Sequence, residues 1–162
     1  MNNDLLAYAD RVGRFYSRQY GFPPMAGRLL GYLAVCDPAR QPVNALAEAL
    51  IASRSAIIEA VKVLEAYHLV QRTRAAGERS DHIAFDPKGL EINGFNPVLY
   101  AEQETLAREG LKLLQDATSE RRAILEETAA MTKFLAERMP QVLDEWRIKR
   151  DNMRAASEKH QS

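Results

Sequence analysis

The chain has 162 residues, with 46% hydrophobic and 27% charged side chains, and its 22 Lys and Arg balance its 22 Asp and Glu. This length fits one domain, or a small domain with an extension, and the composition excludes a disordered chain. No apolar run approaches the ~20 residues that span a bilayer, so we expect a cytoplasmic protein without a membrane partner. Overall neutrality does not predict a nucleic-acid partner, although residues 11–40 are locally basic.

The first predicted element is an amphipathic helix over residues 4–19, where apolar side chains recur at helical spacing. Gly21 and a proline pair end it. A second helix begins after Pro24, a position that proline tolerates, and "DPARQP" stops it. The single cysteine, Cys36, lies in the apolar run "LLGYLAVC". It excludes an internal disulfide, fits a reducing compartment and is expected to be a buried, inert thiol.

Next come a short helix, "VNALAEAL", and a second one that begins at Ser53. Ser53 is a good N-cap, although Ala56 replaces the Glu or Gln of a capping box. Helix, tight turn and capped helix are the outline of a helix-turn-helix. In "ASRSAIIEAVKVLE" one face is apolar and is expected to pack on a core. The outer face could be an ordinary solvated surface or a recognition face, and it carries Arg54, Ser55, Ile58, Glu59, Lys62 and Glu65.

After His68 the pattern changes to period two. The stretches "LVQRTR" and "DHIAF" alternate apolar and polar residues, and "AAGERS" supplies a turn at Gly77. These features predict a β-hairpin with a charged tip. A hairpin directly after the capped helix is the wing of a winged helix-turn-helix, which favours DNA binding.

From residue 97 onward the pattern predicts long helices. Leu99, Leu106 and Leu113 recur every seven residues, and a second stripe follows a break near residues 116–119. Pro140 is expected to end the second helix or to open a third. These stripes need a partner surface, which the first helix and a second copy of the chain would supply. A helical bundle within one chain is the alternative.

Three segments carry a resemblance to a known family: "GFPPMAGRLLGYLAVCDP", "VNALAEALIASRSAIIEAVKVLEAYHLV" and "RTRAAGERSDHIAF". In order and spacing they resemble winged-helix regulators of the GbsR type within the MarR class. The resemblance covers residues 20–86, and its most specific part is Met-Ala-Gly-Arg followed by Gly-Tyr-Leu and Asp-Pro. It implies a homodimeric DNA-binding transcriptional regulator, with the Ser53 helix in the major groove and the wing at the neighbouring minor groove.

The expected fold class is therefore mainly α with a small β-hairpin wing (α+β). Residues 20–90 are expected to form the DNA-binding domain, and residues 1–19 and 97–158 a helical dimerisation region. The resemblance assigns first-turn contacts to Ser53 and its neighbours and a wing contact to Arg79. An apolar side chain at 58 can meet a thymine methyl, and a carboxylate at 59 can accept from cytosine N4. The predicted DNA contacts are Ser53, Arg54, Ser55, Ile58, Glu59, Lys62, Arg72, Arg74 and Arg79.

An effector site is suggested by four clustered aromatic residues: Phe15, Tyr16, Tyr20 and Phe22. Such a cluster can cage a quaternary ammonium, and GbsR-type regulators respond to choline-like molecules. Core packing is the alternative role for these rings.

The predicted function is a homodimeric transcriptional regulator that binds an inverted-repeat operator in double-stranded DNA and responds to a small-molecule effector. The alternative is a winged-helix protein–protein interaction module, which the acidic Glu59 and Glu65 favour slightly. An enzyme is not expected, because HExxH, Walker, GxSxG and CxxC patterns are missing and the three histidines are scattered. No cofactor or metal is expected.

Overall fold

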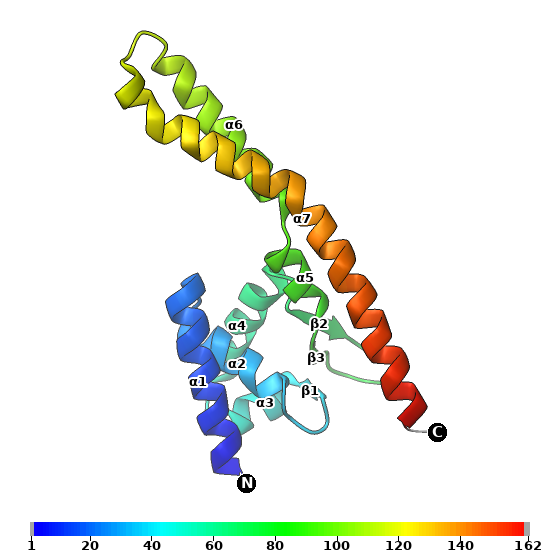
Figure 1. Cartoon of the computed structure of the whole chain (residues 1–162). Coiled ribbons are helices and arrows are strands. Elements are labelled where there is room, and N and C mark those ends of the chain that lie inside the picture. Colours follow the sequence, from blue (N-terminus) through cyan, green and yellow to red (C-terminus); the bar gives the residue numbers. More distant parts are fainter. Residues whose placement is uncertain (1, 161–162) are drawn as a thin grey trace. The chain divides into compact units, whose positions relative to one another are not determined.

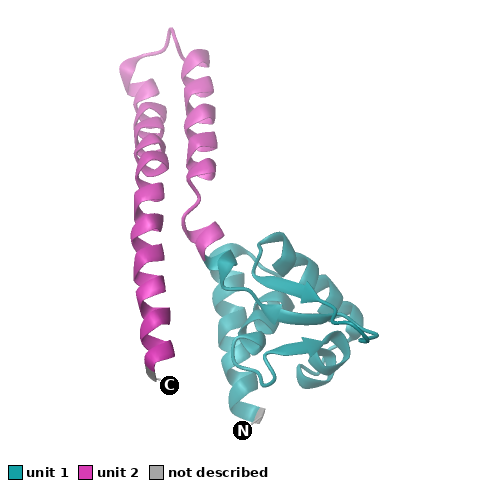
Figure 2. Cartoon of the chain, turned by 90° about the vertical axis from the view of Figure 1, so that its right-hand side faces the viewer, with its two compact units in different colours: residues 1–90 teal, residues 91–162 magenta. Residues whose placement is uncertain are grey.

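The computed structural model describes residues 2–160, which divide into two compact units (Figures 1 and 2). The first unit is Met1–Leu90 and the second is Glu91–Ser162. Within the described residues, no helix is long and apolar enough to cross a membrane. The expected class, mainly α with a small β element, is confirmed. The elements are α1 (Asn2–Tyr20), α2 (Pro24–Leu33), β1 (Arg40–Pro42), α3 (Val43–Ala49), α4 (Arg54–Ala66), β2 (Val70–Thr73), β3 (His82–Phe85), α5 (Lys88–Gly94), α6 (Pro97–Leu113) and α7 (Ser119–His160).

The core of the first unit forms where α2, α3 and α4 meet the sheet. Leu29, Leu46, Ile57, Leu64 and Ile83 are each 0% exposed. Burial of one such side chain contributes about 1.5–3 kcal/mol relative to leaving it in water. The apolar face predicted for the capped helix is therefore the face that packs on the core, and it orients the opposite face of α4 outward.

Helix α1 packs along α2 at a close crossing that glycine permits. A Cβ on Gly27 would lie 2.9 Å from the Cα of Gly13, and a Cβ on Gly31 would lie 2.7 Å from the Cβ of Val12. Any larger residue at these positions would push the helices apart. The first compact unit therefore includes α1. That residues 1–19 and 97–158 together form a dimerisation region stays a prediction.

The sheet has three strands in the order β1-β3-β2, all antiparallel. The β2–β3 hairpin was predicted from the alternating pattern, but β1 was not. Pro42 pairs with His82 at the edge of the sheet, where a residue without an N–H is tolerated. The proline-rich "DPARQP" thus ends a helix and also supplies the third strand.

Three helices end at a residue with positive φ: Gly21 (68°), Ile51 (52°) and His68 (55°) follow α1, α3 and α4. A left-handed residue at this position lets the next amides turn back onto the last free carbonyls of the helix. Glycine takes this conformation without steric cost, whereas a β-branched residue such as isoleucine does not.

The second unit is built around an α6–α7 hairpin, which Figure 2 shows side by side. Ala107, Ala129 and Thr132 are buried between the helices. Gly110 allows a close approach, because a Cβ there would lie 2.8 Å from Leu125 Cδ1. Small residues at the crossing therefore hold the two helices together.

Helix α7 runs through Pro140 without interruption, so the expectation that this proline ends one helix or opens another is wrong. Proline removes one intrahelical hydrogen bond and strains the preceding turn, but it does not prevent the chain from continuing as a helix. With 42 residues against 17 in α6, α7 is about 63 Å long and its hairpin partner only about 25 Å. The second half of α7 thus extends beyond the reach of α6.

One carboxylate in the second unit organises this second half of α7. Glu91 accepts from the indole Nε1 of Trp146 at 3.0 Å and from Arg150 at 2.5 Å, and Arg147 lies 3.6 Å away. The Glu91 side chain is only 16% exposed. These contacts join residues more than fifty positions apart in the sequence.

Candidate nucleic-acid interface

The turn between α3 and α4 is fixed by backbone hydrogen bonds. The N–H of Ile51 donates to the Glu48 carbonyl at 3.2 Å, and the N–H of Ala52 donates to the Ala47 carbonyl at 2.9 Å. This pair of bonds is the Schellman pattern. Ser53 follows as the N-cap of α4, and its Oγ accepts from the N–H of Ala56 at 3.1 Å. The predicted helix-turn-helix and its serine cap are thus present.

The outward face of α4 is polar over its first two turns. The side chains of Arg54, Ser55, Glu59 and Lys62 are exposed, and Ile58 is half-buried. Ser53 and Ser55 lie with their hydroxyl oxygens 3.1 Å apart. This face offers hydrogen-bond donors, acceptors and one apolar side chain, the chemistry with which a helix reads base edges in a major groove.

The acidic residues of α4 are paired within the chain. Glu59 lies 2.7 Å from the ammonium of Lys62, one turn further along the helix. Glu65 accepts two hydrogen bonds from Arg72 of β2, at 3.0 and 3.1 Å. Each carboxylate therefore has a cation beside it, and this weakens the repulsion that a nearby phosphate would meet.

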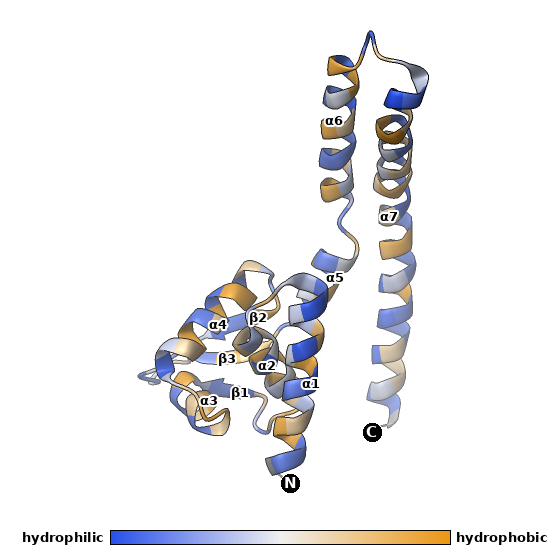
Figure 3. Ribbon diagram, turned by 90° about the vertical axis from the view of Figure 1, so that its left-hand side faces the viewer, coloured by the Kyte–Doolittle hydropathy of each residue, from blue (hydrophilic) through white to orange (hydrophobic). Residues whose placement is uncertain are grey.

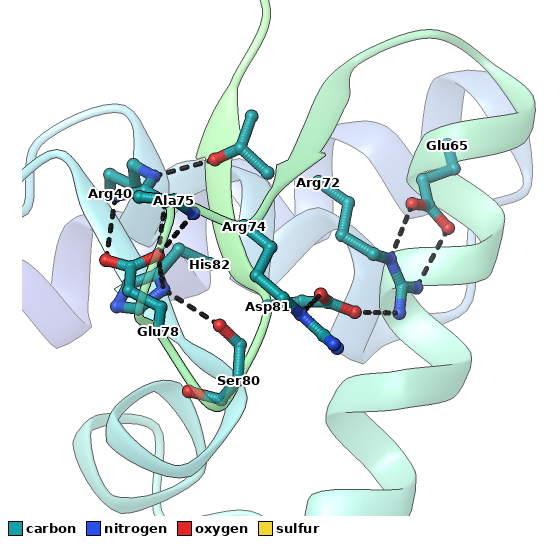
Figure 4. A network of polar contacts seen from close by, with 10 residues as sticks. Arg40, Glu65, Arg72, Arg74, Ala75, Glu78, Ser80, Asp81 and His82 are labelled. Carbon is teal, nitrogen blue, oxygen red and sulfur yellow. Dashed lines mark hydrogen bonds and ion pairs between the residues drawn. The ribbon is translucent and has the colours of Figure 1, made fainter.

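The predicted wing arginines differ in their surroundings, and Figure 4 shows Arg72 and Arg74 beside their acidic partners. Arg72 joins Glu65 to Asp81, at 3.0 and 3.6 Å. Arg74 donates to the same Asp81 at 2.8 Å. These two arginines tie the hairpin to α4 and to itself, whereas Arg79 at the tip of the wing is exposed.

A second set of contacts holds the wing tip, and no pattern in the sequence predicts it. Arg40 of β1 forms a bidentate salt bridge with the Glu78 carboxylate, at 2.7 and 3.2 Å, and its Nε donates to the Thr73 hydroxyl. Glu78 also accepts from the N–H of Ala75 at 2.8 Å (Figure 4). The hydrogen bond from Arg40 and then that from Ala75 hold the pKa of Glu78 below its ordinary value. Arg40 is 38 residues away in the chain, so no local pattern could identify it.

The four aromatic residues singled out in the sequence contact one another. Tyr16 stacks on Tyr20 and on Phe22, with ring centroids 5.4 and 5.5 Å apart, and Phe15 meets Tyr16 edge-on at 5.3 Å. Tyr67, at the end of α4, joins the cluster 4.7 Å from Phe22. Partial burial raises the pKa of the Tyr16 hydroxyl. Phe22 is buried in the core, whereas Phe15 is 45% exposed and Tyr20 is 57% exposed, so the cluster runs from the core to the surface.

An apolar hollow of about 410 Å³ lies beside this cluster. Phe15 and Tyr16 border it, whereas Tyr20 and Phe22 do not. The hollow therefore combines half of the predicted effector residues with side chains from α2, β3 and α5. Its lining is Tyr8, Arg11, Val12, Phe15, Tyr16, Leu30, Gly31, Ala34, Phe85 and Leu90.

Cys36 is free and 8% exposed. Its Sγ lies 3.4 Å from the Pro38 carbonyl oxygen, and burial raises the pKa of the thiol. A thiol held in its protonated form is a poor nucleophile and a poor metal ligand. Within the described residues, no group of three His, Cys, Asp or Glu could hold a metal ion.

A helix-turn-helix followed by a hairpin that pairs with a short third strand defines the winged helix-turn-helix class. Comparison with solved structures agrees. A crystal structure of a transcriptional regulator aligns with a TM-score of 0.75 and 28% sequence identity, over 88% of this chain and 97% of that chain.

The family is given by sequence comparison. The profile of the MmpR5-like MarR family transcriptional regulators matches residues 98–149. The HTH-type transcriptional regulator MmpR5 of Mycobacterium tuberculosis is 30% identical over 133 residues, which are 82% of this chain and 80% of that protein. The chain belongs to the MarR family of transcriptional regulators. These relatives are regulators and not enzymes.

Proposed function

We propose that this regulator binds double-stranded DNA by inserting α4 into the major groove. The observation that carries the proposal is the capped, outward-facing first turn of α4, where Ser53, Arg54 and Ser55 are all exposed at the end of a rigid turn. The first turn of a recognition helix is the part that approaches base edges most closely. Ile58, Glu59 and Lys62 continue this face one turn further.

The hairpin serves as the wing in this proposal. Arg79 at its exposed tip contributes an electrostatic contact to the minor groove, where sequence readout is limited. Arg72 and Arg74 are proposed to act at its base, where their guanidinium groups also bind Glu65 and Asp81. Their contribution to DNA affinity is therefore smaller than that of Arg79.

The active form is proposed to be a homodimer assembled through the second unit. Large apolar side chains remain exposed along α6 and α7. Figure 3 shows hydrophobic segments recurring along the ribbons of both helices. So many exposed apolar residues on two helices mark an interaction surface. They include Val98, Leu99, Leu106, Leu113, Ile124, Met131, Phe134, Ile148 and Met153, with exposed fractions from 45% to 87%. Two copies related by a dyad would bind an inverted repeat.

An effector is proposed to bind at the apolar hollow between α1, α2 and β3. Its lining favours an apolar or aromatic molecule, and Arg11 at its border offers one positive charge. A GbsR-type response to a quaternary ammonium would instead use the faces of Phe15 and Tyr16. The rise in melting temperature on addition of a choline series or of a series of neutral aromatic compounds distinguishes a quaternary-ammonium effector from an apolar one.

A protein-binding module remains the alternative function. Glu59 and Glu65 favoured it in the sequence, but both carboxylates are paired with cations of the same chain. The deciding experiment is to sequence genomic fragments retained by the purified protein at moderate salt and to measure affinity over a salt series. DNA binding requires log Kd to depend linearly on log salt. A protein-binding module retains no fragment and shows no such slope.

A further inference from the structure

One side chain connects α1 and α2 to the turn that precedes the recognition helix. Arg28 of α2 donates from Nη1 to the carbonyl of Leu50, at 2.7 Å. Leu50 is the C-cap of α3, so this carbonyl is one of the helix-end acceptors that have no partner within the helix. The bond joins residues 22 positions apart.

The other edge of the same guanidinium faces α1. Its Nε lies 2.6 Å from Oδ1 of Asp10, although the N–H does not point along that line, so the contact is an ion pair and not a hydrogen bond. The side chain of Arg28 is 23% exposed and that of Asp10 is 45% exposed. Partial burial makes such a pair more effective than one in open solvent.

The two helices that hold this pair are fixed against each other. The close crossing at Gly13, Gly27 and Gly31 leaves no space for α1 to slide along α2. Asp10 therefore has a defined position relative to Arg28. A planar guanidinium can hold a carboxylate and a carbonyl at the same time, which a lysine ammonium on a flexible stem does less well.

We propose that Arg28 is a positioning residue for DNA recognition, with Asp10 as its supporting counter-charge. By holding the Leu50 carbonyl, it fixes the turn from which Ser53 and Arg54 follow within four residues. Contacts to base edges require placement within about 0.5 Å, so a loosened turn weakens readout without removing any contact residue. This inference rests on the proposed DNA-binding function.

The test uses the full-length protein and a duplex obtained by in vitro selection from random DNA with the wild-type chain. The variants are Arg28→Lys, Asp10→Asn and the double variant. Arg18→Lys is the control, because Arg18 is an exposed arginine of α1 near the same end of α2 and borders the same surface depression as Asp10 and Arg28. We expect Arg28→Lys to weaken binding to the selected duplex about tenfold. Affinity for random duplex and the salt slope should not change. The double variant should lose no more than Arg28→Lys alone, because the two residues act as a unit.

Two results overturn the inference. If Arg28→Lys lowers the affinity for selected and random duplexes equally, Arg28 acts through phosphate contacts or overall folding and not through base readout. If the Arg28→Lys variant binds both duplexes with wild-type affinity, the turn does not depend on Arg28. Should thermal melting show that Arg28→Lys fails to fold, Asp10→Asn decides: about a threefold loss on the selected duplex alone supports the proposal, and wild-type affinity contradicts it. A wild-type chain that selects no sequence refutes the proposed function itself, which is separate from any result on the variants.

Discussion

Ile51 is a β-branched residue in a backbone conformation that glycine normally takes. Its φ is 52°, and its side chain is 82% exposed, so almost no burial offsets the strain. The left-handed conformation costs roughly 1–2 kcal/mol for a residue with a Cβ. Glycine avoids this cost, but it loses more conformational entropy on folding, which cancels part of the gain. The turn before the recognition helix is therefore strained at one residue.

We predict that Ile51→Gly raises the free energy of unfolding by about 0.5–1 kcal/mol. Gly21→Ala is the matched control of opposite sign, because Gly21 has a φ of 68° and a Cβ there would meet no atom within 4 Å. It should lower the free energy of unfolding by about 1 kcal/mol for conformational reasons alone. Urea unfolding measures both, and a destabilised Ile51→Gly would show that the Ile51 side chain makes a stabilising contact.

Arg54 and Arg79 should contribute to DNA binding in different ways. We predict that Arg54→Ala lowers the binding free energy for a selected operator by about 1–3 kcal/mol and removes the preference at one base pair. Arg79→Ala should weaken operator and random DNA alike and lower the salt slope by about 0.9. Arg121→Ala, an exposed arginine of α7, is the control. If Arg79→Ala leaves both affinities and slopes unchanged, the hairpin is not a DNA-contacting wing.

The stability of the folded wing tip should depend on pH through Glu78. Its pKa is lowered mainly by the hydrogen bond from Arg40, so the folded state holds the carboxylate charged at pH values where the unfolded chain binds a proton. The contribution to stability is therefore complete above the ordinary glutamate pKa and is lost as the pH falls through the lower, folded value. We expect exchange protection of the Ala75 amide to be constant above the ordinary glutamate pKa, about 4.3, and to decrease as the pH falls below it in the wild type. In Glu78→Gln the protection should not depend on that titration.

At the scale of elements, α7 shows how tertiary context modifies local preference. Proline inside a helix costs about 3 kcal/mol, yet α7 continues for twenty residues beyond Pro140. The contacts of Glu91 with Trp146 and Arg150 lie in that continuation and help to hold it.

Replacing Pro140 should therefore stabilise the helix. We predict that Pro140→Ala raises the free energy of unfolding by up to about 3 kcal/mol, because it restores one hydrogen bond and removes a steric clash. Thermal unfolding followed by circular dichroism measures the change, and the fluorescence of Trp146, the single tryptophan, shows whether its contact with Glu91 persists. A destabilised variant would mean that the chain depends on the backbone geometry that proline imposes at this position.

At the scale of the whole molecule, the exposed apolar side chains of the second unit are the basis of the proposed homodimer. Leu106 and Leu113 follow a seven-residue spacing and are 66% and 87% exposed. An unpaired surface of this kind is unfavourable in water, and pairing with a second copy would bury it.

We predict that the wild-type protein sediments as a dimer at micromolar concentration and that Leu106→Glu shifts it toward a monomer. A buried, unpaired carboxylate at a dimer interface is strongly unfavourable. Gln103→Glu, which adds the same charge at an exposed polar position of α6, should leave the dimer intact. A monomeric wild type would contradict the proposed assembly, and tight operator binding by monomeric Leu106→Glu would contradict the need for two half-sites.

The helix-turn-helix, its serine cap and the wing hairpin followed from the sequence, because each depends on residues within one turn or one strand pair. Ser53 caps a helix through its own first-turn amides, and alternating residues define β2 and β3. The break before α7 was predicted in the same way. Local chemistry was sufficient for these features.

Other features were decided only by tertiary structure. Strand β1 exists because β3 offers it an edge, and α1 joins the first unit because glycines let it approach α2. Arg40 reaches Glu78, and Arg28 reaches Leu50, across gaps of 38 and 22 residues. Contacts over such distances depend on how the chain folds back on itself, and no period or motif in the sequence encodes them.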